Sequence, residues 1–278
     1  MTEPTFTTTP ELADLLAAAR DVDGVDPLNE EAHRALAAGP VTAMTSHSED
    51  GALSGYAHLH QGTAQLVVHP EHRNRGIGTR LAGDLIAGGY QLWSFGALPA
   101  AGRVAEKLDL HSARELLIMG RDLTDLPAPT PLPDGIIIRG FTPADEARII
   151  EINAAAFAHH PEQGAMDAAD FAERCAQSWF RPEGLLVAER DGEVVGFHWT
   201  KRRDDTEGEV YVIGVDPRAH GGGVGKALLW AGLHHLADRG LCRVLLWVEG
   251  DQQAAVALYE RSGFGVLNRD IVWSGAAR

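Results

Sequence analysis

Hydrophobic residues recur along the chain with two periods, one typical of helices and one typical of strands. Near the N-terminus, Leu12, Leu15 and Leu16 have the spacing of one helix face. Thr9 and Pro10 come just before them, and Thr as N-cap followed by Pro as first residue is a common helix start. This pattern predicts a helix that begins at residue 10.

Similar patterns predict further helices and strands in the first half of the chain. A short helix is expected after Pro27, and Asp50-Gly51 marks the turn of a hairpin. The remaining expected elements are strands 41–46, 52–59 and 65–68, helix 76–87, strand 90–95, helix 100–109 and strand 115–119.

The second half is predicted to repeat this order. It contains strand 135–139, a helix after Thr142-Pro143 reaching Phe157, helix 167–179, hairpin strands 185–188 and 194–200, strand 210–215, helix 223–238, strand 243–248, helix 252–261 and strand 264–273. A meander of hairpins that passes into alternating helices and strands predicts an α/β fold, with a mixed α+β sheet covered by helices.

An internal repeat links the two halves. Residues 209–226 read as a strand, a tight loop with three consecutive glycines and a helix start, and residues 65–81 read the same way. The offset between the copies is 217 − 70 = 147 residues. The positions that coincide are Pro70 with Pro217, Gly76 with Gly223, Gly78 with Gly225, and Leu81 with Leu228.

The glycine loops indicate a binding site for a pyrophosphate. Because glycine has no Cβ atom, the backbone N–H groups of these loops can approach a ligand closely. The helix N-terminus that follows adds partial positive charge. Neither loop shows the spacing of a dinucleotide-binding fingerprint. A nucleotide-hydrolysing loop needs Ser or Thr after its lysine, whereas Ala227 follows Lys226.

Composition narrows the class of protein. The 278 residues suffice for two domains, and a net charge of −15 disfavours nucleic acid or a membrane surface as partner. No signal peptide or long apolar run is seen, so a cytoplasmic protein is expected. Cys175 and Cys242 lack metal-site spacing and are expected to be buried small hydrophobes, with no metal site.

A proline-rich segment divides the chain. Pro127, Pro129, Pro131 and Pro133 exclude helix and sheet and favour an extended linker. The expected organisation is an N-terminal domain of residues 1–123, a linker of 124–134 and a C-terminal domain of 135–278.

The motifs themselves resemble a known superfamily. Residues 73–78 (RNRGIG) behind a strand, and residues 252–264 (QQAAVALYERSGF), are similar to the GNAT superfamily of acyl-CoA-dependent N-acyltransferases. The resemblance covers nearly the whole chain and implies two tandem GNAT domains. It also implies that acetyl-CoA is the co-substrate, with its pyrophosphate in the glycine loop, its pantetheine along the preceding strand and its thioester beside the later helix. In the second loop, His220 stands at the position where the superfamily usually has Arg or Gln.

By this resemblance the residues expected to bind acetyl-CoA fall into three groups. The first copy contributes Leu66, Val67, Val68, Arg73, Asn74, Arg75, Gly76, Ile77 and Gly78. The second copy contributes Ile213, Gly214, Val215, His220, Gly221, Gly222, Gly223, Val224, Gly225 and Lys226. The later helix contributes Gln252, Gln253, Ala254, Ala255, Val256 and Ala257.

Two residues are candidates for proton transfer. Glu209, at a strand start, is the expected base, acting directly or through water, and Tyr259 is the expected acid that protonates the CoA sulfur. The alternatives are a solvated strand-end carboxylate and a core tyrosine. The repeat aligns Glu209 with Gly62 and Tyr259 with Ala105. Catalysis is therefore expected in the C-terminal domain only, and the N-terminal domain is expected to hold acetyl-CoA structurally or to have lost it.

A narrower resemblance within the superfamily, carried by residues 160–164, 199–201 and 209–217, implies a pocket for a small-molecule amine. Its expected lining is Glu30, Glu162, Lys201, Glu209 and Trp247, with Glu31 as an alternative to Glu30. Two other functions stay open: acetylation of another amine, such as an aminoglycoside or a protein N-terminus, and acetyl-CoA binding without turnover. Two fused copies can act as a pseudo-dimer, so a monomer is expected.

Overall fold

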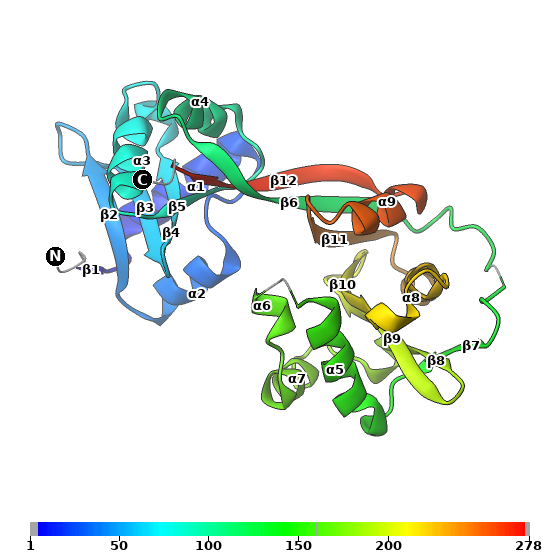
Figure 1. Ribbon diagram of the computed structural model, residues 1–278. Helices are drawn as coiled ribbons and strands as arrows, with labels where there is room; N and C mark the ends of the chain where they lie inside the picture. The colour runs from blue at the N-terminus through cyan, green and yellow to red at the C-terminus, as the bar shows by residue number, and fades with distance from the viewer. Residues whose placement is uncertain (1–4, 130, 159–160, 276–278) are drawn as a thin grey trace. The chain divides into compact units, whose positions relative to one another are not determined.

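The computed structural model describes residues 5–129, 131–158 and 161–275, with only the backbone at 161 and 162. The chain forms two compact units (Figure 1). Unit 1 comprises Met1–Leu117, Glu249–Gln253 and Leu267–Arg278, and unit 2 comprises Ile118–Val248 and Ala254–Val266. Strands β6 (His111–Asp122) and β12 (Gly265–Ser274) contribute residues to both units.

The last strand is assigned differently from the sequence expectation. Residues 267–278 were expected in the C-terminal domain, whereas they cluster with unit 1. The physical reason is strand pairing, since Ile271 of β12 lies opposite Ser94 in an antiparallel ladder. Sequence order alone carries no information on this pairing.

Unit 1 is a mixed sheet with helices against it. Its elements are β1 (Thr5–Phe6), α1 (Pro10–Asp23), α2 (Glu30–Ala38), β2 (Val41–His47), β3 (Leu53–His60), β4 (Thr63–Val68), η1 (Pro70–His72), α3 (Ile77–Ala87), β5 (Gln91–Ser94) and α4 (Pro99–Lys107). The strand order is β1-β2-β3-β4-β5-β12, in which β4 and β5 pair in parallel. The expected helix start is confirmed, because the Thr9 side chain accepts a hydrogen bond from the Leu12 amide at 3.3 Å.

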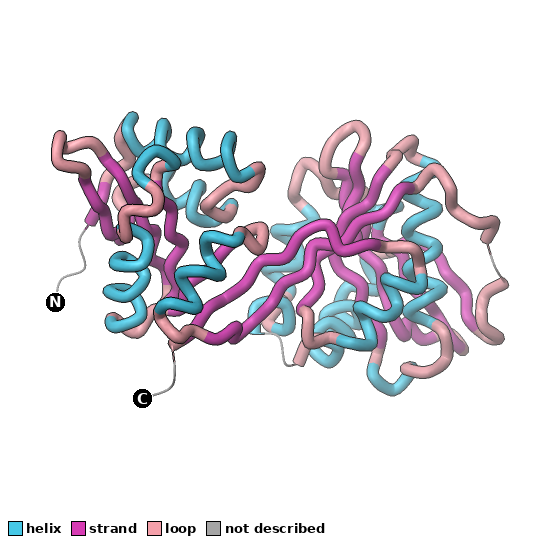
Figure 2. Tube along the Cα trace, turned by 90° about the horizontal axis from the view of Figure 1, so that it is seen from above, coloured by secondary structure: helices cyan, strands magenta, loops and turns pink. Residues whose placement is uncertain are grey.

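Unit 2 has the same layout. Its elements are β7 (Ile136–Gly140), η2 (Pro143–Asp145), α5 (Glu146–Ala156), α6 (Pro161–Gly164), α7 (Ala168–Cys175), η3 (Pro182–Gly184), β8 (Leu185–Arg190), β9 (Glu193–Arg202), β10 (Glu207–Val215), η4 (Pro217–Ala219), α8 (Val224–Asp238), β11 (Arg243–Glu249) and α9 (Gln253–Arg261). The strand order is β6-β11-β10-β9-β8-β7. Helices and strands are distinguished by colour in Figure 2.

Two apolar cores flank the sheet of unit 2. One core packs α5 and α7 against β8, β9 and β10, and includes Phe171 and Trp199. The other packs α8 against the opposite face and includes Val224 and Leu228. The mixed sheet covered by helices, expected from the sequence, is therefore confirmed.

Some local expectations were wrong. The helix expected over 167–179 ends at Cys175, because Trp179 packs in the aromatic core, 4.8 Å from Tyr211 between ring centroids. Cys242 is exposed and Cys175 only half-buried, so they are not two buried hydrophobes. Cys242 lies in the turn before β11, where its backbone N–H donates to the Thr206 carbonyl.

In each unit a parallel pair of strands separates before the longer strand ends. In unit 2, β10 pairs with β11 over Glu207–Glu209, within the described residues, and β10 continues to Val215. In unit 1, β4 pairs with β5 over Thr63–Gln65 and continues to Val68. Beyond these points, one edge of β10 and of β4 is open to a ligand. Among the described residues, no helix has both the length and the apolar character to span a bilayer.

Candidate active site

The helices after the two glycine loops begin without a side-chain cap. Gly76 and Gly223 are their N-cap residues, at φ of 82° and 75°, a left-handed conformation that favours glycine. By contrast, Thr9, Asn29 and Asp167 cap α1, α2 and α7 with side-chain hydrogen bonds. The first N–H groups of α3 and α8 are thus available to a ligand, which fits the pyrophosphate of a CoA thioester.

The residue at the Arg or Gln position of each loop ties that loop to its strand. Arg73 donates from Nε to the Val68 carbonyl at 3.1 Å, and His220 Nε2 lies 3.2 Å from the Val215 carbonyl. The Arg73 guanidinium also makes two 2.7 Å hydrogen bonds to Asp23. The histidine therefore makes the same loop-to-strand contact as the arginine.

Sequence reasoning missed one cation at the second loop. Arg190, at the end of β8, lies against Gly222, so that an added Cβ there would stand 2.8 Å from Arg190 Nη2. A guanidinium beside a phosphate-sized loop is suited to pair with phosphate oxygens. No sequence pattern identifies Arg190, because it lies far from the loop in the chain.

Replacing Arg190 by Ala is expected to raise the KM for acetyl-CoA by roughly tenfold, the effect of losing about 1.4 kcal/mol of charge-assisted hydrogen bonding. The change should appear in steady-state kinetics with kcat nearly unchanged, because the contact is to a part of the donor that does not react. Arg202→Ala is the matched control, since Arg202 pairs with Asp205 and is mostly exposed. An unchanged KM in Arg190→Ala would contradict the role.

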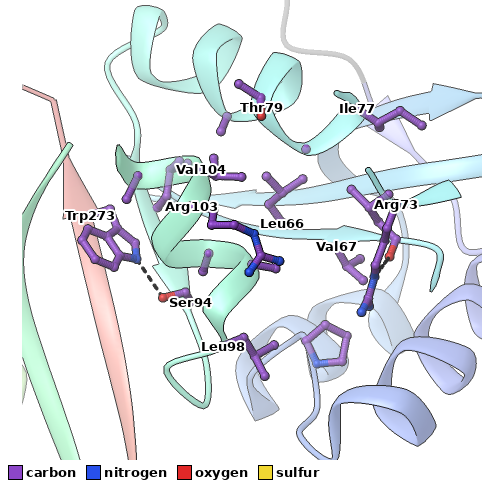
Figure 3. A pocket seen from close by; sticks show the side chains of 18 of the residues that line it. Leu66, Val67, Arg73, Ile77, Thr79, Ser94, Leu98, Arg103, Val104 and Trp273 are labelled. Carbon is purple, nitrogen blue, oxygen red and sulfur yellow. Dashed lines mark hydrogen bonds between the residues drawn. The ribbon is translucent and has the colours of Figure 1, made fainter. Parts of the chain in front are cut away.

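Unit 1 contains a cavity of about 500 Å³ beside the first glycine loop (Figure 3). Most of the predicted residues of the first copy line it, namely Leu66, Val67, Val68, Arg73, Asn74, Gly76, Ile77 and Gly78. Arg75 is not among the lining residues; its guanidinium lies 3.5 Å from His72. The lining from β5, α4 and β12 was not predicted, including Arg103 and Trp273, whose indole donates to Ser94 at 2.9 Å.

In unit 2, the buried Glu209 forms the centre of a charged group with two partly exposed cations. Glu209 is only 7% exposed, and it lies opposite Lys201 in the ladder between β10 and β9. The carboxylate is 3.8 Å from Lys201 Nζ and 3.1 Å from Arg203 Nη1. Glu209 is also the last residue of β10 that pairs with β11, so the base candidate stands where the strands separate.

Aromatic rings complete this group. Arg203 lies over the Trp247 ring at 5.0 Å, and Lys201 lies over Trp179 and Tyr211 at 5.1 and 5.3 Å. The structure thus brings together the predicted Lys201, Glu209 and Trp247. It adds Arg203, Trp179 and Tyr211, which the sequence analysis missed, although Arg203 follows two residues after the predicted Lys201.

Tyr259 is buried in α9, with its ring 5.6 Å from that of Phe264. Burial raises the pKa of the Tyr259 phenol above its usual range. The phenol is protonated at neutral pH, as an ordinary tyrosine already is, and burial extends this state to higher pH.

The two other predicted acceptor residues are Glu30 and Glu162. Glu30 is an exposed first residue of α2 in unit 1, and the alternative, Glu31, pairs with His60 at 3.0 Å. The side chain of Glu162 lies outside the described residues.

A β-bulge in β10 changes which residue of the first copy corresponds to Glu209. The register between β9 and β10 shifts between Val210 and Val212, which adds one residue to β10. Counted back from Val215 and its counterpart Val68, Glu209 then corresponds to Thr63 rather than to Gly62. The first copy has no carboxylate at either position.

Comparison with known proteins identifies the class. The chain matches the acetyltransferase (GNAT) family over residues 10–91 and again over 148–264. The protein belongs to the acetyltransferase (GNAT) family, in which it carries two tandem copies of the domain.

Individual relatives with high sequence identity indicate a more specific group within the family. Mycothiol acetyltransferase of Actinosynnema mirum is 42% identical over 280 residues, covering 95% of this chain and 94% of the relative. Mycothiol acetyltransferase of Salinispora tropica is 46% identical over 277 residues, with coverages of 92% and 90%. A crystal structure of a GCN5-related N-acetyltransferase from Sphaerobacter thermophilus has a TM-score of 0.72 at 24% identity, covering 97% and 94% of the two chains. That structure supports the fold.

Proposed function

We propose that this protein is a mycothiol synthase. It transfers the acetyl group of acetyl-CoA to the cysteinyl α-amine of 1D-myo-inositol 2-(L-cysteinylamino)-2-deoxy-α-D-glucopyranoside (Cys-GlcN-Ins), giving mycothiol and CoA. The acceptor follows from the names of relatives that align over both units. The observation that carries the chemistry is the buried Glu209 where β10 and β11 separate.

Direct attack of the amine on the thioester requires a neutral nitrogen. An α-amino group has a pKa of about 8, so near neutrality most of it carries a proton that must be removed. Glu209 accepts this proton, directly or through one water. Lys201 and Arg203 both contact Oε2 of its carboxylate and hold it in place.

Collapse of the tetrahedral intermediate breaks the carbon–sulfur bond and leaves a thiolate. The protonated phenol of Tyr259 donates its proton to this sulfur, and the second proton that the nitrogen loses as the amide forms returns through water to the phenolate. Backbone N–H groups on the open edge of β10, beyond Glu209, polarise the thioester carbonyl. Acetyl-CoA lies along Ile213 to Val215, with its pyrophosphate on the loop of 220–226 and the start of α9 beside it.

The proposed acceptor site of unit 2 contains Lys201, Glu209 and Trp247, together with Glu162. Carboxylates suit the ammonium group of the acceptor, and an aromatic edge suits its sugar ring. In this proposal the first copy binds a CoA thioester without turning it over, and the protein acts as a cytoplasmic monomer.

The test is CoA release from acetyl-CoA by the purified full-length protein, measured by chromatography because the acceptor carries its own thiol. Cys-GlcN-Ins is compared with simple amines, aminoglycosides and peptides. Preference for Cys-GlcN-Ins by orders of magnitude is the expected result. If another amine is preferred, the acceptor is wrong. If acetyl-CoA binds without any turnover, the protein is an acetyl-CoA-binding regulator instead.

A further inference from the structure

The helix that carries Tyr259 has a close counterpart in unit 1. Both α9 (Gln253–Arg261) and α4 (Pro99–Lys107) span nine residues, and Tyr259 and Ala105 are each the seventh. Both helices end in the same way, since the Phe264 amide donates to the Tyr259 carbonyl at 3.0 Å and the Leu110 amide donates to the Ala105 carbonyl at 2.9 Å. The structure therefore supports the alignment of these positions independently of the sequence.

Unit 1 lacks both aromatic rings at these positions. Where unit 2 has the contacting pair Tyr259 and Phe264, unit 1 has Ala105 and Leu110. Both Ala105 and Leu110 line the 500 Å³ cavity beside the first glycine loop. The space that a phenol ring would take is thus part of the cavity.

Much of the wall at this end of the cavity is apolar, and Ser94, Arg103 and Lys107 also line the cavity. Its wall residues Ala82, Leu92, Val104, Leu110 and Trp273 belong to one hydrophobic cluster of unit 1. Arg73, which lies on the side of the cavity away from Trp273 in Figure 3, and Asn74 belong to the glycine loop. An elongated ligand with an anionic end and an apolar end matches this distribution.

We propose that the cavity of unit 1 binds an acyl-CoA whose acyl chain is longer than acetyl, with the chain in the space beside Ala105 and Leu110. The inference rests on the proposed function, because the role given to Tyr259 places the thioester sulfur beside this helix position. Without a carboxylate at Gly62 or Thr63 and without a phenol at Ala105, the bound thioester is not turned over.

The test is calorimetric titration of the full-length protein, without acceptor, with acetyl-, butyryl- and hexanoyl-CoA. Burial of each added methylene is worth at most about 0.8 kcal/mol, or roughly a fourfold gain in affinity. Butyryl-CoA is therefore expected to bind one site per chain up to about 16-fold more tightly than acetyl-CoA. Affinity that stays level or falls with chain length would overturn the inference.

Ala105→Phe places a ring in the space beside Leu110. It is expected to abolish the gain in affinity that the longer acyl chain provides. Gly102→Ala is the matched control on the same helix, because an added Cβ at Gly102 has no described atom within 4 Å. Retention of the gain in Ala105→Phe would contradict the inference.

A labelling experiment on the unaltered chain decides the matter if Ala105→Phe does not fold. A CoA thioester with a photoreactive diazirine in its acyl chain is expected to label peptides from residues 82–110. Labelling of residues 253–264 alone would overturn the inference. Acceptor-dependent CoA release is measured separately, so loss of turnover with retained chain-length dependence would contradict the proposed function and not this inference.

Discussion

Glu209→Gln is expected to lower kcat by about 10²- to 10⁴-fold, the usual contribution of a general base. The amide keeps the size of the side chain and can still contact Lys201 and Arg203, but it cannot accept the proton of the amine. The deficit is expected to narrow above about pH 8, where the α-amine is already neutral. Steady-state rates between pH 6.5 and 9.5 measure both effects.

Glu207→Gln is the matched control. Glu207 lies on the same strand and also pairs with Arg203, at 3.2 Å, but is not expected to contact the amine. Its kcat is expected to stay within a few-fold of the unaltered protein. If both variants lose the same activity, or if the Glu209 deficit is independent of pH, Glu209 serves to hold Arg203 in place and is not the base.

Tyr259→Phe is expected to lower kcat by about 10²-fold or more, because the thiolate must then leave without a proton from the enzyme. The pKa of Tyr259 is raised by burial, so the phenol stays protonated above pH 10, beyond its ordinary titration. The unaltered enzyme should therefore show no loss of rate from Tyr259 ionisation between pH 7 and 10. Rates across this range, with both substrates saturating, provide the measurement.

Tyr56→Phe provides the comparison for loss of a buried hydroxyl. Tyr56 is also fully buried with a raised pKa, and its hydroxyl contacts His58 in unit 1. This variant is expected to lose some stability but to keep its kcat. Equal losses of kcat in both tyrosine variants would show that the effect at Tyr259 is one of packing.

The secondary structure could be predicted largely from local signals. The Thr9-Pro10 helix start and the Asp50-Gly51 turn depend on neighbouring residues, and both are present in the structure. Helix ends were less predictable. The helix expected to reach residue 179 stops at Cys175, because packing of Trp179 against Tyr211 outweighs its helical pattern.

The sequence by itself determined the repeat, the two glycine loops and the candidate pair Glu209 and Tyr259. These features depend on residue type and spacing, which the linear chain displays. It also indicated that the first copy lacks the acid and the base, since Gly62 and Ala105 cannot transfer protons.

Only the tertiary structure decided which distant residues join these sites. Pairing of β12 with β5 brings the C-terminal segment into unit 1, and Arg190 reaches the second glycine loop from β8. The bulge in β10 moves the counterpart of Glu209 to Thr63, and Arg203 links Glu209 to Trp247. Each depends on strand pairing or side-chain packing between separate parts of the chain, which spacing along the sequence does not specify.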